Sequence, residues 1–289
     1  MKVEAVSVCV NYSDYLKVSL PINKQILDKI VIVTRSDDYE TIKVCKENNV
    51  ECIATDEFNN HPSGFNKFKG INKGLDKLDK DGWILFLDCD IVLDPLSRRV
   101  FDNVNFNKNA LYGCDRVNCI GYNGWVNRKE LVFGNWLLTP GSMELGSRIC
   151  QYYGQQGDNG RFAGWKPLGF FQMVHNSTLT KYPTETEGYD RADMVFANRY
   201  SRDNRVFIPE ILVIHLESHG AQMGDNWRGR ITLPFDYNKK SSIIVNFIMY
   251  KRRFKKFIID TIFKYINKKI KYGTKKDKGG ISMISNLFS

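Results

Sequence analysis

The sequence predicts an α/β protein with a mostly parallel β-sheet flanked by helices. Apolar segments of strand length alternate with segments of helical spacing from Val3 onwards. One of them, at the start of Trp83–Asp94 (WILFLDCDIVLD), is apolar on both faces, which is typical of a central strand in a parallel sheet. Polar residues follow the ends of several expected strands, where ligands bind in such sheets.

The first half of the chain alternates regularly between strands and helices. This order favours parallel pairing with right-handed crossovers. Pro21 is placed where it can split the first helix. The expected strands are residues 3–10, 29–34, 50–55 and the segment from Trp83, and the expected helices are residues 15–26, 39–48 and 65–78.

The second half is less regular and richer in glycine and asparagine. Its polar segment Gly154–Gly164 is a candidate mobile cover over a substrate. The expected strands are residues 111–117, 131–138, 168–174 and 205–216, and the expected helix is 191–201.

Two carboxylates, Asp88 and Asp90, interrupt the apolar run that starts at Trp83. Carboxylates are seldom buried without a partner, because removing their charge from water is costly. A divalent cation bound to a diphosphate would neutralise both acids. The alternative is a helix cap or an ion-paired turn after an ordinary strand.

The positive charge of the chain is concentrated near its C-terminus. The segment Lys251–Lys278 holds 12 basic and 2 acidic residues, so its net charge of +10 equals that of the whole chain. Apolar residues recur at helical spacing over residues 247–271, which predicts a basic amphipathic helix. We therefore expect a main domain over residues 1–235 and a tail over 236–289, with a loose C-terminus. The helix suits an anionic membrane surface, docking on the main domain or contact with nucleic acid.

The composition favours a cytoplasmic protein, peripheral at a membrane surface if the tail binds there. The 7 cysteines include no Cys-x-x-Cys pair, which predicts reduced thiols and no zinc cage. The N-terminal segment has the pattern of a strand rather than of a signal peptide. No apolar run reaches the roughly 18 residues expected of a membrane-spanning helix.

Four motifs together resemble one family of enzymes. They are the strand end Asn11-Tyr12, the helix with Lys67, Asn72 and Gly74 ahead of LFLDCDIVL, the segment Ala192-Asp193-Met194, and His215 in VIHLE. In this order and spacing, Val3 to Arg230 resembles the nucleotide-sugar glycosyltransferases of the GT-A fold, particularly the family 2-like members. The resemblance implies a Rossmann-like sheet, a glycosyltransferase activity and an Asp-x-Asp metal motif.

The resemblance implies a Mn²⁺ or Mg²⁺ site made of Asp88, Asp90 and His215. Asp90 is the expected direct ligand, and Asp88 contacts the ribose or a metal-bound water. An imidazole ligand suits manganese better than magnesium. His219 is the alternative to His215.

An inverting transfer needs a general base for the acceptor hydroxyl. Asp193 is the expected base, but Ala192 stands where the family usually has Glu, so Asp190 remains open. A retaining enzyme would not need this base. The residues expected to contact the nucleotide sugar are Tyr12, Thr34, Asp56, Lys67, Asp88, Arg228 and Arg230.

The expected activity is the transfer of a sugar from a nucleoside-diphosphate sugar, most of all a UDP-sugar, to a hydroxyl of a glycan or glycoconjugate acceptor. A sugar-nucleotidyltransferase is an alternative, although Asn11-Tyr12-Ser13-Asp14 is not its usual Gly-rich phosphate loop. A non-enzymatic module that binds nucleic acid or membrane through the basic tail is another. The neutral main domain and the absence of a nucleic-acid motif speak against nucleic acid as a partner.

Overall fold

A computed structural model describes residues 1–59, 66–126, 143–145, 166–184, 192–217 and Phe235. Met1–Tyr237 forms one compact unit. Residues 236–289 lie outside the described part, so the predicted domain boundary and the amphipathic tail helix stay predictions. The described helices include none that is long and apolar enough to cross a membrane.

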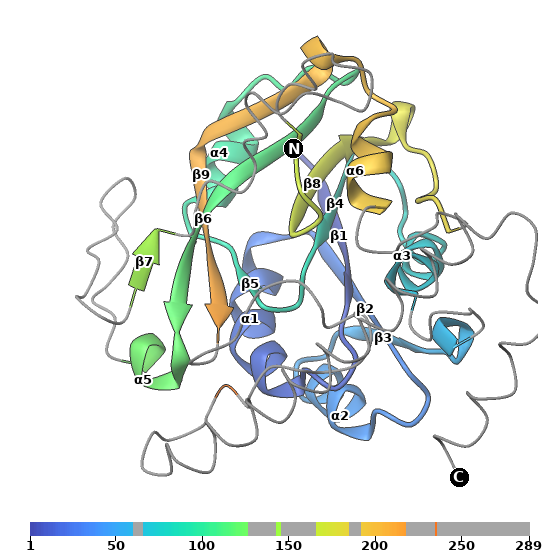
Figure 1. The fold of residues 1–289 in the computed structure, drawn as a ribbon, viewed down its shortest axis with the longest axis vertical. Helices are drawn as coiled ribbons and strands as arrows, with labels where there is room; N and C mark the ends of the chain where they lie inside the picture. The colour runs from blue at the N-terminus through green and yellow to red at the C-terminus, as the bar shows by residue number, and fades with distance from the viewer. Residues whose placement is uncertain (60–65, 127–142, 146–165, 185–191, 218–234, 236–289) are drawn as a thin grey trace, which may run out of the picture. The chain divides into compact units, whose positions relative to one another are not determined.

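The described strands form one mixed sheet (Figure 1) with the order β3-β2-β1-β4-β8-β6-β9-β5, and β7 pairs with β6. Strands β3, β2, β1 and β4 are parallel, whereas β8 is antiparallel to both β4 and β6. The strands are β1 (Val3–Val8), β2 (Lys29–Thr34), β3 (Glu51–Ala54), β4 (Trp83–Leu87), β5 (Ile91–Val92), β6 (Leu111–Ile120), β7 (Met143–Leu145), β8 (Phe171–His175) and β9 (Arg205–Glu217).

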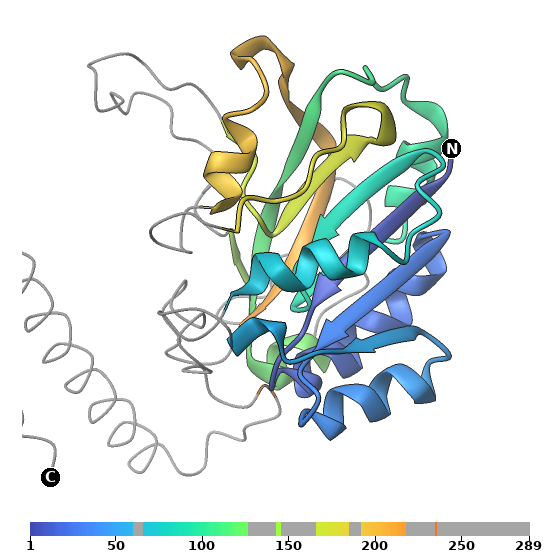
Figure 2. The ribbon, with the colours of Figure 1, turned by 90° about the vertical axis from the view of Figure 1, so that its right-hand side faces the viewer.

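The helices cover both faces of this sheet. Those of the described residues are α1 (Ser13–Ile26), α2 (Tyr39–Glu47), α3 (Lys67–Leu75), α4 (Ser97–Asn103), α5 (Gly121–Val126) and α6 (Ala192–Ala197). Along the central strands, alternate residues enter different cores, as the period of two in a β-strand requires. Ile30, Ile32, Leu85 and Leu87 pack with α1 and α2, and their neighbours in the strands pack with α3 and α6. These two sets of helices lie on opposite faces of the sheet (Figure 2).

The predicted α/β class is confirmed, and the elements differ from expectation in a few places. The predicted parallel pairing holds for the first half, while the second half adds antiparallel partners. Helix α1 continues through Pro21, with Leu20 before it and Ile26 after it both almost fully buried. Helices α4 and α5 and the short strand β7 were not expected, and the single strand expected over Trp83–Asp94 is divided into β4 and β5 by a turn. The predicted strand 131–138 and the loop 154–164 lie outside the described residues.

Gly74 lets helix α3 lie against the sheet. A Cβ atom there would lie 2.4 Å from Cγ1 of Val6 and 3.0 Å from Cγ2 of Val33, both in buried strand cores. Helix propensity alone would make alanine more stable than glycine by about 1 kcal/mol. We expect Gly74→Ala instead to lower the free energy of unfolding by about 1–3 kcal/mol, because the core must move to admit the methyl group.

Urea denaturation measures this effect. Lys43→Ala, at an exposed position within α2, is the control and should change stability by less than about 0.5 kcal/mol. An unchanged or raised stability of Gly74→Ala would show that α3 does not pack as closely as described.

Candidate active site

The two acids of the Asp-x-Asp motif lie in the turn between β4 and β5. The chain leaves β4 at Leu87, and Ile91 N donates to Asp88 O at 3.1 Å, which closes the turn. Strand β9 then holds Asp90 in place, since Leu216 N donates to Asp90 O at 2.8 Å and Ile91 pairs with His215. The pairing of β5 with β9 therefore brings His215 to Asp90 from a distant part of the chain.

Asp90 and His215 lie close enough to share one cation. Nε2 of His215 is 3.4 Å from Oδ2 of Asp90. Metal–ligand distances of roughly 2.0–2.3 Å put two ligands of one ion about that far apart. Oδ1 of Asp90 is buried and has no hydrogen-bond partner among the described residues. This oxygen–nitrogen pair fits a divalent cation such as Mn²⁺.

The protein groups do not form a complete metal cage. Among the described residues, no three His, Cys, Asp or Glu side chains are grouped to hold a metal ion. The remaining ligands would have to come from water or from a bound phosphate, as is common for cations that serve phosphate substrates.

Asp88 forms an ion pair with Lys67. Lys67 is the first residue of α3, and the Asn66 side chain caps that helix by accepting from Phe68 N at 3.1 Å and Lys69 N at 3.2 Å. Both partners are about a quarter exposed, at 27% for Lys67 and 29% for Asp88. The pair is therefore partly accessible to solvent, within reach of an incoming phosphate.

The charges of the site act on one another. Burial and the neighbouring Asp90 raise the pKa of Asp88 against the opposing pull of Lys67. Although burial opposes its charge, Asp90 has a lowered pKa because His215 and Lys67 attract the carboxylate. Burial likewise opposes the charge of Lys67, but Asp88, Asp193 and Asp90 raise its pKa. The Lys67 ammonium is thus attracted by three carboxylates, those of Asp88, Asp90 and Asp193.

Asp193 lies at the start of α6, beside this cluster. Gly169 N donates to its Oδ2 at 2.8 Å and Met194 N donates to its Oδ1 at 2.8 Å. Gly169 permits this approach, because a Cβ there would lie 2.9 Å from Asp193 Cβ. Burial raises the pKa of Asp193, with the two backbone donors and Lys67 opposing it. A carboxylate with a raised pKa is better suited to accept a proton.

A buried glutamine ties Asp193 to the sheet. Nε2 of Gln172 donates to Pro167 O at 2.8 Å and to Asp193 O at 3.1 Å. Its Oε1 accepts from Tyr182 Oη. Gln172 is fully buried in β8, so this network fixes the backbone that carries the candidate base.

The other residues predicted to contact the nucleotide differ in position and exposure. Tyr12, Thr34 and Asp56 follow or end parallel strands, so they share the sheet edge with Asp88. Tyr12 packs on Tyr15 with ring centroids 5.3 Å apart, and Asp56 is exposed. The Thr34 hydroxyl donates to Asp38 Oδ2 at 2.9 Å and is buried, so it supports the start of α2. The predicted site residues Asp190, Arg228 and Arg230, and the alternative ligand His219, lie outside the described residues.

Sequence reasoning missed two supporting residues, Glu217 and Gln172. Nδ1 of His215 lies 2.9 Å from Oε1 of Glu217. The signal for Glu217 was its position two residues after His215 in a strand, which puts both side chains on one face. Gln172 had no such signal, because its partners are backbone groups that only the fold brings near.

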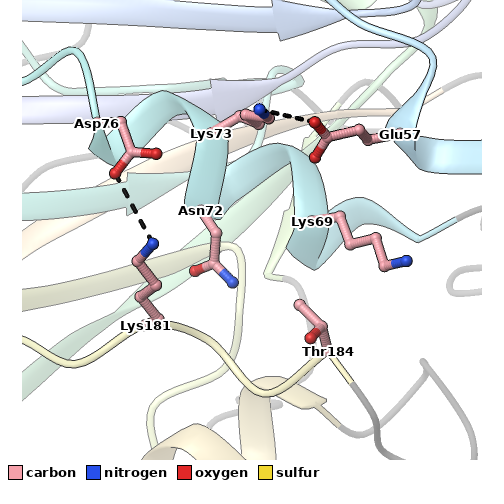
Figure 3. A pocket seen from close by; sticks show the side chains of 7 residues that line it. All are labelled: Glu57, Lys69, Asn72, Lys73, Asp76, Lys181 and Thr184. Carbon is pink, nitrogen blue, oxygen red and sulfur yellow. Dashed lines mark ion pairs between the residues drawn. The ribbon is translucent and has the colours of Figure 1, made fainter.

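A separate cavity of about 530 Å³ lies beside the outer side of α3 (Figure 3). Its charges are largely paired, with Lys73 Nζ 2.6 Å from Glu57 Oε1 and Lys181 Nζ 3.9 Å from Asp76 Oδ1. None of the metal, phosphate or base candidates lines it. It therefore does not enlarge the site around Asp90.

The sequence matches no model of a protein family, and the search of curated proteins found no match. Solved structures with a similar fold exist. Mannosyl-3-phosphoglycerate synthase from Rubrobacter xylanophilus is 16% identical, with a TM-score of 0.32, over 40% of this chain and 41% of that one. The match thus spans less than half the length of that synthase.

Glucosyl-3-phosphoglycerate synthase from Mycobacterium tuberculosis is matched over more of this chain. Its complex with Mn²⁺, UDP-glucose and phosphoglyceric acid is 13% identical, with a TM-score of 0.48, over 74% of this chain and 71% of that one. Another structure of the enzyme is 12% identical, with a TM-score of 0.46, over 79% of this chain and 75% of that one. These neighbours are GT-A fold glycosyltransferases, the class that the sequence motifs resemble.

Proposed function

We propose that this protein is a metal-dependent, inverting glycosyltransferase that uses a nucleoside-diphosphate sugar, with UDP as the nucleotide. The observation that carries the proposal is the convergence of a cation-binding pair, Asp90 and His215, with an ammonium, Lys67, and a candidate base, Asp193. The acceptor is a hydroxyl of a glycan or glycoconjugate.

Each residue has a distinct part in the proposed reaction. Asp90 and His215 would hold Mn²⁺, which when bound would supply a Lewis acid for the diphosphate leaving group. Lys67 would exchange its contact with Asp88 for the diphosphate, and the released Asp88 would accept hydrogen bonds from the ribose or from water. These charges make the nucleoside diphosphate a better leaving group.

Asp193 completes the transfer at the acceptor. The acceptor oxygen forms a bond to the anomeric carbon, and the bond from that carbon to the diphosphate oxygen breaks. The hydroxyl proton passes to the Asp193 carboxylate, and the bonding electrons leave with the diphosphate. The hydrogen bonds from Gly169 and Met194 hold the carboxylate in place without using all of its lone pairs.

A thermal-shift screen of nucleotides and nucleotide sugars tests this proposal. We expect UDP or a UDP-sugar to raise Tm only when Mn²⁺ is present. At a ligand concentration of 100 times Kd the stabilisation is about 2.7 kcal/mol, which for a domain of this size is roughly 5–10 °C.

Uridine with Mn²⁺ is the control, because it lacks the diphosphate and should give no shift. Release of UDP in the presence of a mixed panel of glycans then reports transfer. If no nucleotide at millimolar concentration raises Tm with Mn²⁺, the proposed donor site is wrong.

A further inference from the structure

His215 lies between two carboxylates. Its Nδ1 is 2.9 Å from Glu217 Oε1, and its Nε2 is 3.4 Å from Asp90 Oδ2. The side chains of His215 and Glu217 are only 12% and 11% exposed. An imidazole held in this way can present only one nitrogen to a cation.

The two distances favour one arrangement of the ring proton. Protein N–H···O hydrogen bonds span about 2.7–3.2 Å between heavy atoms, so the contact to Glu217 is within range and the contact to Asp90 is beyond it. A neutral imidazole carries one proton. Placing that proton on Nδ1, facing Glu217, leaves the lone pair of Nε2 directed toward Asp90.

Two buried oxygens support this arrangement. Oε1 of Glu217 and Oδ1 of Asp90 are both buried and lack a well-aligned hydrogen-bond donor among the described residues. A small rotation of the imidazole would give Glu217 its donor, and a cation beside Nε2 would give Asp90 its partner. One orientation of the imidazole ring would thus offset the cost of burying both Glu217 Oε1 and Asp90 Oδ1.

We propose that Glu217 is a positioning residue that fixes His215 in the Nδ1–H tautomer, with Nε2 turned toward Asp90, and thereby raises the affinity of the site for Mn²⁺. The proposal rests on the metal site of the proposed function. Outer carboxylates of this kind orient a histidine ligand and increase its basicity, and their loss typically weakens metal binding about 10–100-fold.

Nitrogen-15 NMR of the full-length, metal-free protein tests the tautomer directly. The chain has only 4 histidines, so ¹⁵N-histidine labelling gives few signals, and His215→Asn assigns the relevant one. At a pH where the imidazole is neutral, we expect the Nδ1–H form of His215 in the wild type and loss of that preference in Glu217→Ala. The wild-type spectrum tests the proposal even if the variant does not fold.

Mn²⁺ binding, followed by electron paramagnetic resonance, tests the consequence. Glu217→Ala should weaken Mn²⁺ binding about 10–100-fold. Glu210→Ala, at an exposed position in the same strand, should leave both the tautomer and the affinity unchanged.

A wild-type His215 in the Nε2–H form would overturn the proposal, and so would a folded Glu217→Ala variant that keeps the wild-type tautomer or Mn²⁺ affinity. The tautomer is measured without metal or sugar nucleotide. Failure of the proposed transferase function would appear in the thermal-shift and UDP-release assays. The tautomer of His215 can be interpreted independently of those assays.

Discussion

Asp90→Asn should abolish the rise in Tm that UDP-sugar and Mn²⁺ produce together. The substitution keeps the shape of the side chain but removes the charge of the proposed metal ligand, whose buried Oδ1 has no hydrogen-bond partner in the described structure. A bound cation contributes several kcal/mol to stabilising transition-state charge, and each 1.36 kcal/mol is a factor of ten. We therefore expect kcat/KM to fall by roughly 10²–10³-fold or more.

Asp81→Asn is the matched control for this prediction. Asp81 is exposed in the turn before β4, at the opposite end of the strand that leads to Asp90. Its variant should keep the metal-dependent shift and the activity. If the Asp90→Asn protein folds and still binds the nucleotide only in the presence of Mn²⁺, then Asp90 is not a ligand of the metal.

The two acids of the motif should not be equivalent. Burial opposes the charge of both, yet attraction to His215 and Lys67 lowers the pKa of Asp90, while burial and Asp90 itself raise the pKa of Asp88. Asp90 thus holds its negative charge more firmly. This difference favours Asp90 as the metal ligand and Asp88 as the exchangeable partner of Lys67.

The first half of the fold was predictable because its signals are local. Strand β2 has the predicted bounds, and α2 and β4 follow runs of residues whose burial is determined by their own period. The antiparallel insertion of β8 between β4 and β6 was not predictable. Strand order depends on pairing between distant segments, and the sequences of β4, β6 and β8 do not indicate which strands they pair with.

The site shows the same division. Asp88 and Asp90 could be singled out because carboxylates within an apolar run are unusual, and His215 because the sequence resembles a family with a metal ligand there. Their partners were harder to foresee. That Lys67 pairs with Asp88, and that Glu217 lies beside Nδ1 of His215, depends on distances that only the folded chain sets.

Asp193→Asn should reduce kcat about 10²–10⁴-fold, the usual contribution of a general base. The donor is held by other residues, so the KM for the UDP-sugar and the Mn²⁺-dependent Tm shift should change little. The same assay gives a pH dependence. Asp193 must be deprotonated to act, and burial raises its pKa, so activity should fall on acidification at a pH above the ordinary aspartate value of about 3.9.

Asp203→Asn, an exposed acid between α6 and β9, is the control and should leave kcat unchanged. Asp190→Asn decides between the two candidate bases. Loss of kcat in Asp190→Asn with normal turnover in Asp193→Asn would move the base to Asp190. Normal turnover in both variants would contradict base-assisted inversion and favour a retaining transfer, in which the donor and metal residues alone carry the reaction.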